Sequence, residues 1–146
     1  MMKKWLIRIG RAAMMGLAWA VAWAPLAVVI GTMIVDSDNS MDEMWALAGI
    51  YPGFLCGAVF FAVLGIAERH RKLDELPLSR VGAWGAVSGL LVGGLWVVVA
   101  LLSDPPQWLL YGAVVGSLTA LSAVSGVASS LVARIGKSHE ASAHVA

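Results

Sequence analysis

The sequence predicts an all-α integral membrane protein, a bundle of four transmembrane helices forming a single domain over residues 1–146. Composition is the first reason: 60% of the residues are hydrophobic and 13% are charged, whereas a soluble domain carries about 25% charged residues. The second reason is that the charged residues are confined to short segments between four apolar runs. The third is that basic and acidic segments alternate along the chain, which sets an orientation.

Each charge-free run is long enough to cross the hydrocarbon core of a bilayer, which takes about 20 apolar residues in a helix. A buried helix in a soluble protein would instead need a large polar domain around it, and the segments outside the runs are short. We therefore expect transmembrane helices at about residues 12–35, 44–67, 81–103 and 108–133.

The first run has features of a secretory signal, because basic residues precede it and residues 22–24 (AWA) resemble a cleavage site. However, Pro25 would follow the cut, where proline is poorly tolerated, and the apolar run continues to Val35. We therefore expect a retained helix, kinked near Pro25.

The second and third runs are joined by ERHRKLDELPLSR (residues 68–80). Glu68/Lys72 and Arg71/Glu75 are spaced as ion pairs on a helix. This spacing predicts that the second helix runs past the membrane surface until a proline at position 77, and that a serine at position 79 caps the third helix. The connection also has the composition of a basic turn attracted to anionic lipid.

The fourth run follows Pro105 and Pro106, and a small, polar tail (residues 138–146) follows it, for which we expect disorder. The ten basic residues flank the runs in three groups, while the other two connections carry acidic residues instead. The positive-inside rule then places both termini and the middle connection in the cytoplasm. The basic groups are Lys3, Lys4, Arg8 and Arg11; Arg69, Arg71, Lys72 and Arg80; and Arg134 and Lys137.

Small residues recur at every fourth position on three of the expected helices, a glycine-zipper pattern that places them on one face. Such a face lets a neighbouring backbone approach closely, which favours helix packing in lipid. Glycine is also common in transmembrane helices, and the pattern does not distinguish packing within the chain from packing on another subunit. The residues expected to pack are Gly49, Gly53 and Gly57; Gly85, Gly89 and Gly93; and Gly112, Gly116 and Ala120.

The second and fourth runs also resemble each other, which suggests two tandem helical hairpins. Their tryptophans and glycines align at a common offset, and chance convergence on a packing motif explains the match equally well. The aligned pairs are Trp45/Trp108, Gly49/Gly112 and Gly53/Gly116.

The four runs contain no Asp, Glu, Lys, Arg or His, the residues that mark proton relays and ion pathways in membranes. The single cysteine, Cys56, cannot form a disulfide within the chain. We therefore expect no enzyme activity, no catalytic or metal-binding residue and no cofactor. One polar feature remains on the fourth run, where hydroxyls either bond their own helix or line a path for a small solute or ion: Thr119, Ser122, Ser125 and Ser129.

The stretch GIAERHRKLDELPLSRVGAWGAVSGLL (residues 65–91), after MDEMW and YPGF, resembles small uncharacterised bacterial four-span inner-membrane proteins over residues 15–100. The resemblance implies a location and a topology, and no activity.

Two functions are compatible with these features. One is a structural or accessory subunit that packs through small-residue helix faces. The other is a small channel or transporter, formed by an oligomer and lined by the fourth helix. As partners we expect the lipid bilayer and a second copy or a larger membrane complex, and no nucleic acid.

Overall fold

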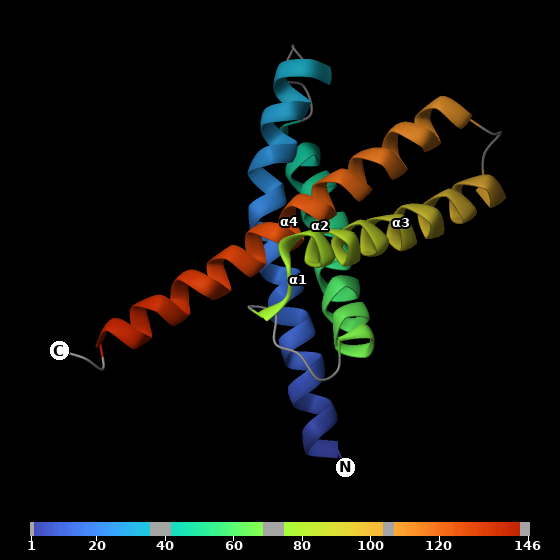
Figure 1. Cartoon of the computed structure of the whole chain (residues 1–146). Helices are drawn as coiled ribbons and strands as arrows, with labels where there is room; N and C mark the ends of the chain where they lie inside the picture. The colour runs from blue at the N-terminus through green and yellow to red at the C-terminus, as the bar shows by residue number, and fades with distance from the viewer. Residues whose placement is uncertain (1, 36–41, 69–74, 104–106, 144–146) are drawn as a thin grey trace. The chain divides into compact units, whose positions relative to one another are not determined.

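The computed structural model describes residues 2–35, 42–68, 75–103 and 107–143, and these residues are almost entirely helical (Figure 1). The predicted all-α class with four long helices is confirmed, and the described residues contain no strand. The elements are α1 (Met2–Ile30), the π-helix η1 (Gly31–Val35), α2 (Asp42–Ala67), α3 (Leu78–Ser103) and α4 (Trp108–Ala143).

All four α-helices contain a segment long and apolar enough to cross a membrane. Large apolar side chains point outward along them: Leu102 is 84% exposed and Leu109 is 94% exposed. Such surfaces are unfavourable in water and suit contact with lipid. The chain is therefore a multi-pass membrane protein. Its spans are Leu6–Met33, Met44–Ala67, Leu78–Leu102 and Trp108–Gly136.

The prolines do not interrupt their helices, since α1 runs through Pro25 and α2 runs through Pro52. A proline removes one backbone hydrogen bond, a loss that transmembrane helices tolerate. The irregular part of the first span comes later, where the helix widens into η1. There the Thr32 hydroxyl donates to the Val28 carbonyl oxygen at 2.9 Å.

The predicted extension of the second helix to Pro77 is wrong. The helix ends at Ala67, Glu68 lies in a turn, and residues 75–77 are not α-helical. Lys72 and Arg71, the expected partners of Glu68 and Glu75, lie outside the described residues. Proline disfavours a helical conformation in the residue before it, which agrees with Leu76 lying outside any helix.

The expected cap at Ser79 is also wrong, because the third helix starts one residue earlier, at Leu78. The amides of Arg80 and Val81 donate to the Pro77 carbonyl oxygen at 3.0 and 3.1 Å. Pro77 therefore accepts the first hydrogen bonds of the helix, and Ser79 lies within its first turn.

The tail is more ordered than expected, because α4 continues to Ala143. The sequence after Gly136 contains alanine, lysine and glutamate, which have high helix propensity. The prediction of disorder is wrong for residues 138–143, and residues 144–146 lie outside the description.

The chain divides into two compact units, Met1–Ala62 and Val63–Ala146. In the first unit, α1 packs against α2, and the ring of Trp19 stacks on Phe60 with centroids 5.1 Å apart. In the second unit, α3 packs against α4, and Tyr111 meets Trp96 edge to face at 5.7 Å. Each unit has its own buried residues, among them Trp23 in the first and Val81 in the second.

Candidate functional site

In the first unit, the predicted glycine face of α2 lies against the backbone of α1. A Cβ added at Gly49 would lie 2.6 Å from the Trp23 carbonyl oxygen, and one at Gly57 would lie 2.9 Å from that of Met15. At Gly53 the nearest backbone atom of α1 would be 3.1 Å away. A side chain at these positions would push the two helices apart, so glycine permits this close approach.

In the second unit, the glycine face of α3 lies against the backbone of α4. A Cβ at Gly89 would lie 2.5 Å from the Leu118 carbonyl oxygen, and one at Gly85 would overlap that of Ser122. The approach at Gly93 is wider, with the α4 backbone 3.2 Å from the added atom. The structure therefore brings six of the nine predicted packing residues to helix contacts within the chain.

The remaining three, on α4, are in a different position. A Cβ at Gly112 or Gly116 would meet no heavy atom of the described residues within 4 Å, and Ala120 is exposed. Gly49 and Gly53, which align with these glycines in sequence, are covered. The similarity between α2 and α4 therefore does not extend to their packing, and the contact expected for the α4 face stays a prediction.

The hydroxyls of α4 mostly bond within their own helix. Thr119 donates to the Val115 carbonyl oxygen at 2.7 Å, and Ser129 donates to that of Ser125 at 2.8 Å. Ser122 is fully buried, and its hydroxyl has no hydrogen-bond partner among the described residues. Thr119 and Ser129 therefore bond their own helix, whereas the Ser122 hydroxyl is buried without such a bond.

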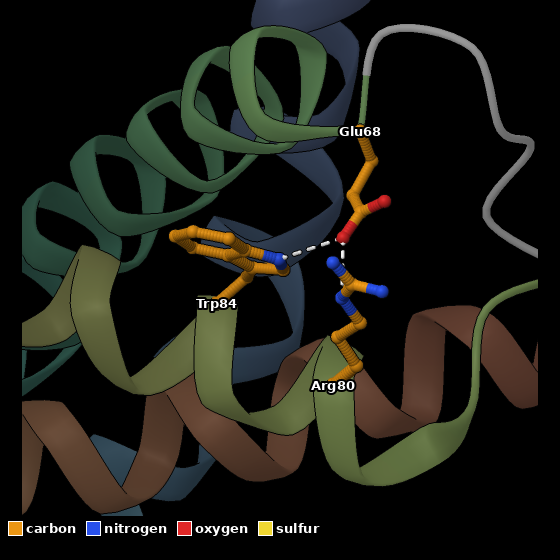
Figure 2. A network of polar contacts seen from close by, with 3 residues as sticks. All are labelled: Glu68, Arg80 and Trp84. Atoms are coloured by element: carbon orange, nitrogen blue, oxygen red, sulfur yellow. Dashed lines mark hydrogen bonds and ion pairs between the residues drawn. The ribbon is translucent and has the colours of Figure 1, made fainter.

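A buried polar cluster lies in the second unit, where the end of α2 contacts the start of α3. The Glu68 side chain is 5% exposed, and its Oε1 lies 2.6 Å from Arg80 Nε. The indole Nε1 of Trp84 donates to the same oxygen at 3.3 Å. Figure 2 shows both donors converging on one carboxylate oxygen from adjacent turns of α3.

This convergence follows from local geometry. Arg80 and Trp84 are four residues apart and therefore share a helix face. A buried carboxylate needs a counter-charge and hydrogen bonds to offset its desolvation, and this face supplies both. The amide of Glu68 also donates to the Leu64 carbonyl oxygen at 2.8 Å, which anchors the residue to the end of α2.

Arg134 of α4 contacts the backbone just before α3. Arg134 Nη2 donates to the carbonyl oxygen of Leu76 at 2.6 Å, and the Leu76 side chain is fully buried. The guanidinium thus satisfies a backbone oxygen that lies outside any helix. Glu68 therefore joins the end of α2 to the start of α3, and Arg134 joins α4 to the backbone at Leu76.

The sequence interpretation missed this cluster, because it assigned Glu68 to Lys72 on a continuous helix. Two signals were present. Glu68 is the first charge after one apolar run and Arg80 is the last before the next, so opposite charges bracket the connection. Trp84 follows one turn later, where its indole can reach the same partner.

The Glu68 carboxylate is committed to two donors, and the described residues contain no group of three or more His, Cys, Asp or Glu side chains that could hold a metal ion. Cys56 is buried in the first unit. The candidate features of the described residues are therefore the close helix contacts at glycine and one buried polar cluster.

No known protein family, curated protein or solved structure matches this sequence. The function is consequently argued from the molecule itself.

Proposed function

We propose that this protein is a structural or accessory subunit of a bacterial inner membrane, and that it associates with a second copy through the α4 face of Gly112, Gly116 and Ala120. The observation that supports this proposal is the unequal use of three similar faces. Two glycine faces are covered by a helix of their own unit, and the third is uncovered by the described residues of the second unit.

The physical reason is the source of helix attraction in a bilayer. Lipid tails are as apolar as leucine, so helices gain little from burying large apolar side chains, and close backbone contact supplies the attraction. A face without side chains packs poorly against lipid and well against another helix. A second copy presents the same small-residue face, so two α4 helices can approach each other closely.

A channel lined by α4 is the weaker interpretation. A water-filled path needs polar groups turned toward it, whereas Thr119 and Ser129 donate to their own helix. We therefore propose that the protein alone conducts no ions. Flux of K⁺, Na⁺, H⁺ or Cl⁻ into liposomes that contain the purified protein, above that of empty vesicles, would favour the channel instead.

The proposed association is tested by native mass spectrometry of the purified chain in mild detergent. We expect a dimer for the unaltered protein and a monomer for Gly116→Leu. The matched control is Gly94→Leu on α3, because a Cβ at Gly94 would also meet no heavy atom of the described residues within 4 Å, and it should remain dimeric. A monomeric unaltered protein would contradict self-association and favour a contact with a larger membrane complex. A dimer that survives Gly116→Leu would contradict the α4 face as the interface.

The proposed orientation places both termini in the cytoplasm, and it rests on the distribution of the ten basic residues. A reporter that is active only in the cytoplasm, fused after Ala146, should give a signal. Activity of a reporter that works only in the periplasm would reverse the orientation.

A further inference from the structure

An open apolar groove of about 360 Å³ lies between α3 and α4 in the second unit. Gly82 lines it on the α3 side, where an added Cβ would lie 3.2 Å from Val127 Cγ2. The volume is within the range of small-molecule sites, about 300–1,000 Å³. The lining residues are Gly82, Ala123, Val124, Val127, Ala128 and Leu131.

A positive charge lies on the same face of α4 as two residues of the groove lining. Val127, Leu131 and Arg134 are spaced i, i+4 and i+7 on α4, so they share one face. The fourth span ends at Gly136, which places Arg134 near the end of the span, at the depth of lipid headgroups.

The Arg134 guanidinium is positioned by one hydrogen bond, which leaves other N–H groups available. Its Nη2 donates to the Leu76 carbonyl oxygen at 2.6 Å, which fixes the group beside the connection to α3. A guanidinium carries five N–H donors. Among the described residues its hydrogen-bond partner is Leu76, so donors remain for an anion at the membrane surface.

We propose that the groove and Arg134 together bind one anionic phospholipid, with an acyl chain in the groove and the phosphate on the guanidinium. Basic sites between transmembrane helices are suited to acidic lipid headgroups, and arginine suits phosphate because two of its N–H groups can bind two oxygens. The apolar groove supplies what a charged headgroup site alone lacks, a place for the chain. The proposal requires a bilayer and does not require a dimer.

The same features favour a lipid over other occupants. Free phosphate would find one guanidinium and no polar lining in the groove. A second copy could place a helix in the groove, but its four spans contain no acidic residue to meet Arg134. An anionic lipid satisfies both parts at once.

The test uses the full chain in dodecyl maltoside, with dioleoylphosphatidylglycerol, dioleoylphosphatidylcholine or inorganic phosphate added separately. Native mass spectrometry counts the lipids retained, and thermal unfolding reports stabilisation. We expect one retained phosphatidylglycerol and a raised melting temperature with that lipid. Phosphatidylcholine and inorganic phosphate should give neither effect.

Two variants separate the headgroup from the chain. Arg134→Gln should weaken phosphatidylglycerol binding by about tenfold, through the loss of a charged hydrogen-bond donor. Ala128→Leu fills the groove while leaving Arg134 in place, and it should also weaken retention. Arg11→Gln, in the first unit, is a control with the same loss of charge. Ala113→Leu, at an exposed residue of α4 that does not line the groove, is a control with the same gain of volume. Both variants should retain the lipid.

The outcomes are distinct from those of the dimer experiment, because Gly116→Leu should retain the lipid even as a monomer. If Arg134→Gln is unstable before lipid is added, Ala128→Leu carries the test. Unchanged lipid retention in Ala128→Leu would overturn the proposal. Equal retention of phosphatidylglycerol and phosphatidylcholine would also overturn the proposal. The proposal would fail as well if Ala128→Leu became monomeric but still retained the lipid.

Discussion

The two units of the molecule use the same small-residue spacing to build interfaces of different character. In the first, the glycines of α2 approach α1 between large aromatic side chains, since Trp19 and Trp23 are 3% and 4% exposed and Phe60 is fully buried. In the second, the glycines of α3 approach a part of α4 rich in hydroxyls, with Ser122 and Ser130 fully buried. The glycine face permits the approach, and the partner helix determines what is buried beside it.

The units also differ in their buried polar groups. The second unit has the Glu68 cluster and the Arg134 bond at one end, both joining segments far apart in sequence. In the first unit, the indole nitrogen of Trp45 is buried and has no hydrogen-bond partner among the described residues. We therefore expect the second unit to depend on charge as well as on close packing.

The largest effect should come from placing a large side chain between α3 and α4. Gly89→Leu should lower the free energy of unfolding by about 3 kcal/mol, because the added atoms collide with the α4 backbone. Leu91→Ala is the control, at a residue 55% exposed, and should change the same quantity by less than about 0.5 kcal/mol. Unfolding in mixed detergent micelles measures both, and equal stability of the two variants would refute the role of the glycine face.

The dependence on charge should be the next largest effect. Arg80→Ala should lower the free energy of unfolding by about 2 kcal/mol, because it leaves a buried carboxylate without its counter-charge. Glu68→Gln should cost less, about 1 kcal/mol, since it keeps the shape and removes the charge that needed a partner.

Arg11→Ala, at an exposed residue of the first unit, is the control for this pair and should be close to neutral. The same micelle unfolding experiment applies. A Glu68→Gln variant that is less stable than Arg80→Ala would contradict this account of the cluster.

Alanine substitutions should sharpen the comparison between the two interfaces. A Cβ at Gly53 would lie 3.1 Å from the α1 backbone, whereas one at Gly89 would lie 2.5 Å from the α4 backbone. Alanine gains about 1 kcal/mol of helix propensity over glycine at either site, which should offset the contact at Gly53 and not at Gly89. We expect Gly89→Ala to be about 1 kcal/mol less stable than Gly53→Ala, and the reverse order would show that the first interface is the tighter one.

The smallest effects should come from the serines of α4. Two alanine substitutions there should change the free energy of unfolding in opposite directions. Ser122→Ala removes a buried hydroxyl without a hydrogen-bond partner among the described residues and should raise the free energy of unfolding by about 0.5 kcal/mol. Ser129→Ala removes a hydroxyl that bonds the Ser125 carbonyl oxygen and should lower it by about 0.6 kcal/mol. Equal shifts in the two thermal unfolding curves would mean that the Ser122 hydroxyl is satisfied in the membrane.

Much of the fold was predictable, because membrane insertion is governed by short-range properties of the chain. A helix is the arrangement in which one segment satisfies its own backbone hydrogen bonds in lipid, so the length and composition of each run were sufficient to predict four spans. The boundaries were less predictable. The charge spacing after Glu68 favours a longer helix, and the chain instead leaves the helix at Ala67.

The faces of the helices were predictable, but their partners were not. The four-residue spacing places Gly85 and Gly89 on one side of α3 in any helix. It does not say that α4 covers this side while Gly112 and Gly116 stay uncovered within the described residues. That choice depends on which backbones fit together, a property of two segments and not of one.

The sequence by itself determined the helical class, the number of spans and the faces that can pack, because each follows from composition and periodicity within one segment. The tertiary structure alone decided that Glu68 pairs with Arg80 and Trp84, and that Arg134 holds the Leu76 carbonyl. These contacts join groups 12, 16 and 58 residues apart, and only the folded path of the chain brings them within hydrogen-bond distance. The same path forms the apolar groove that is lined by Gly82 of α3 and by residues of α4.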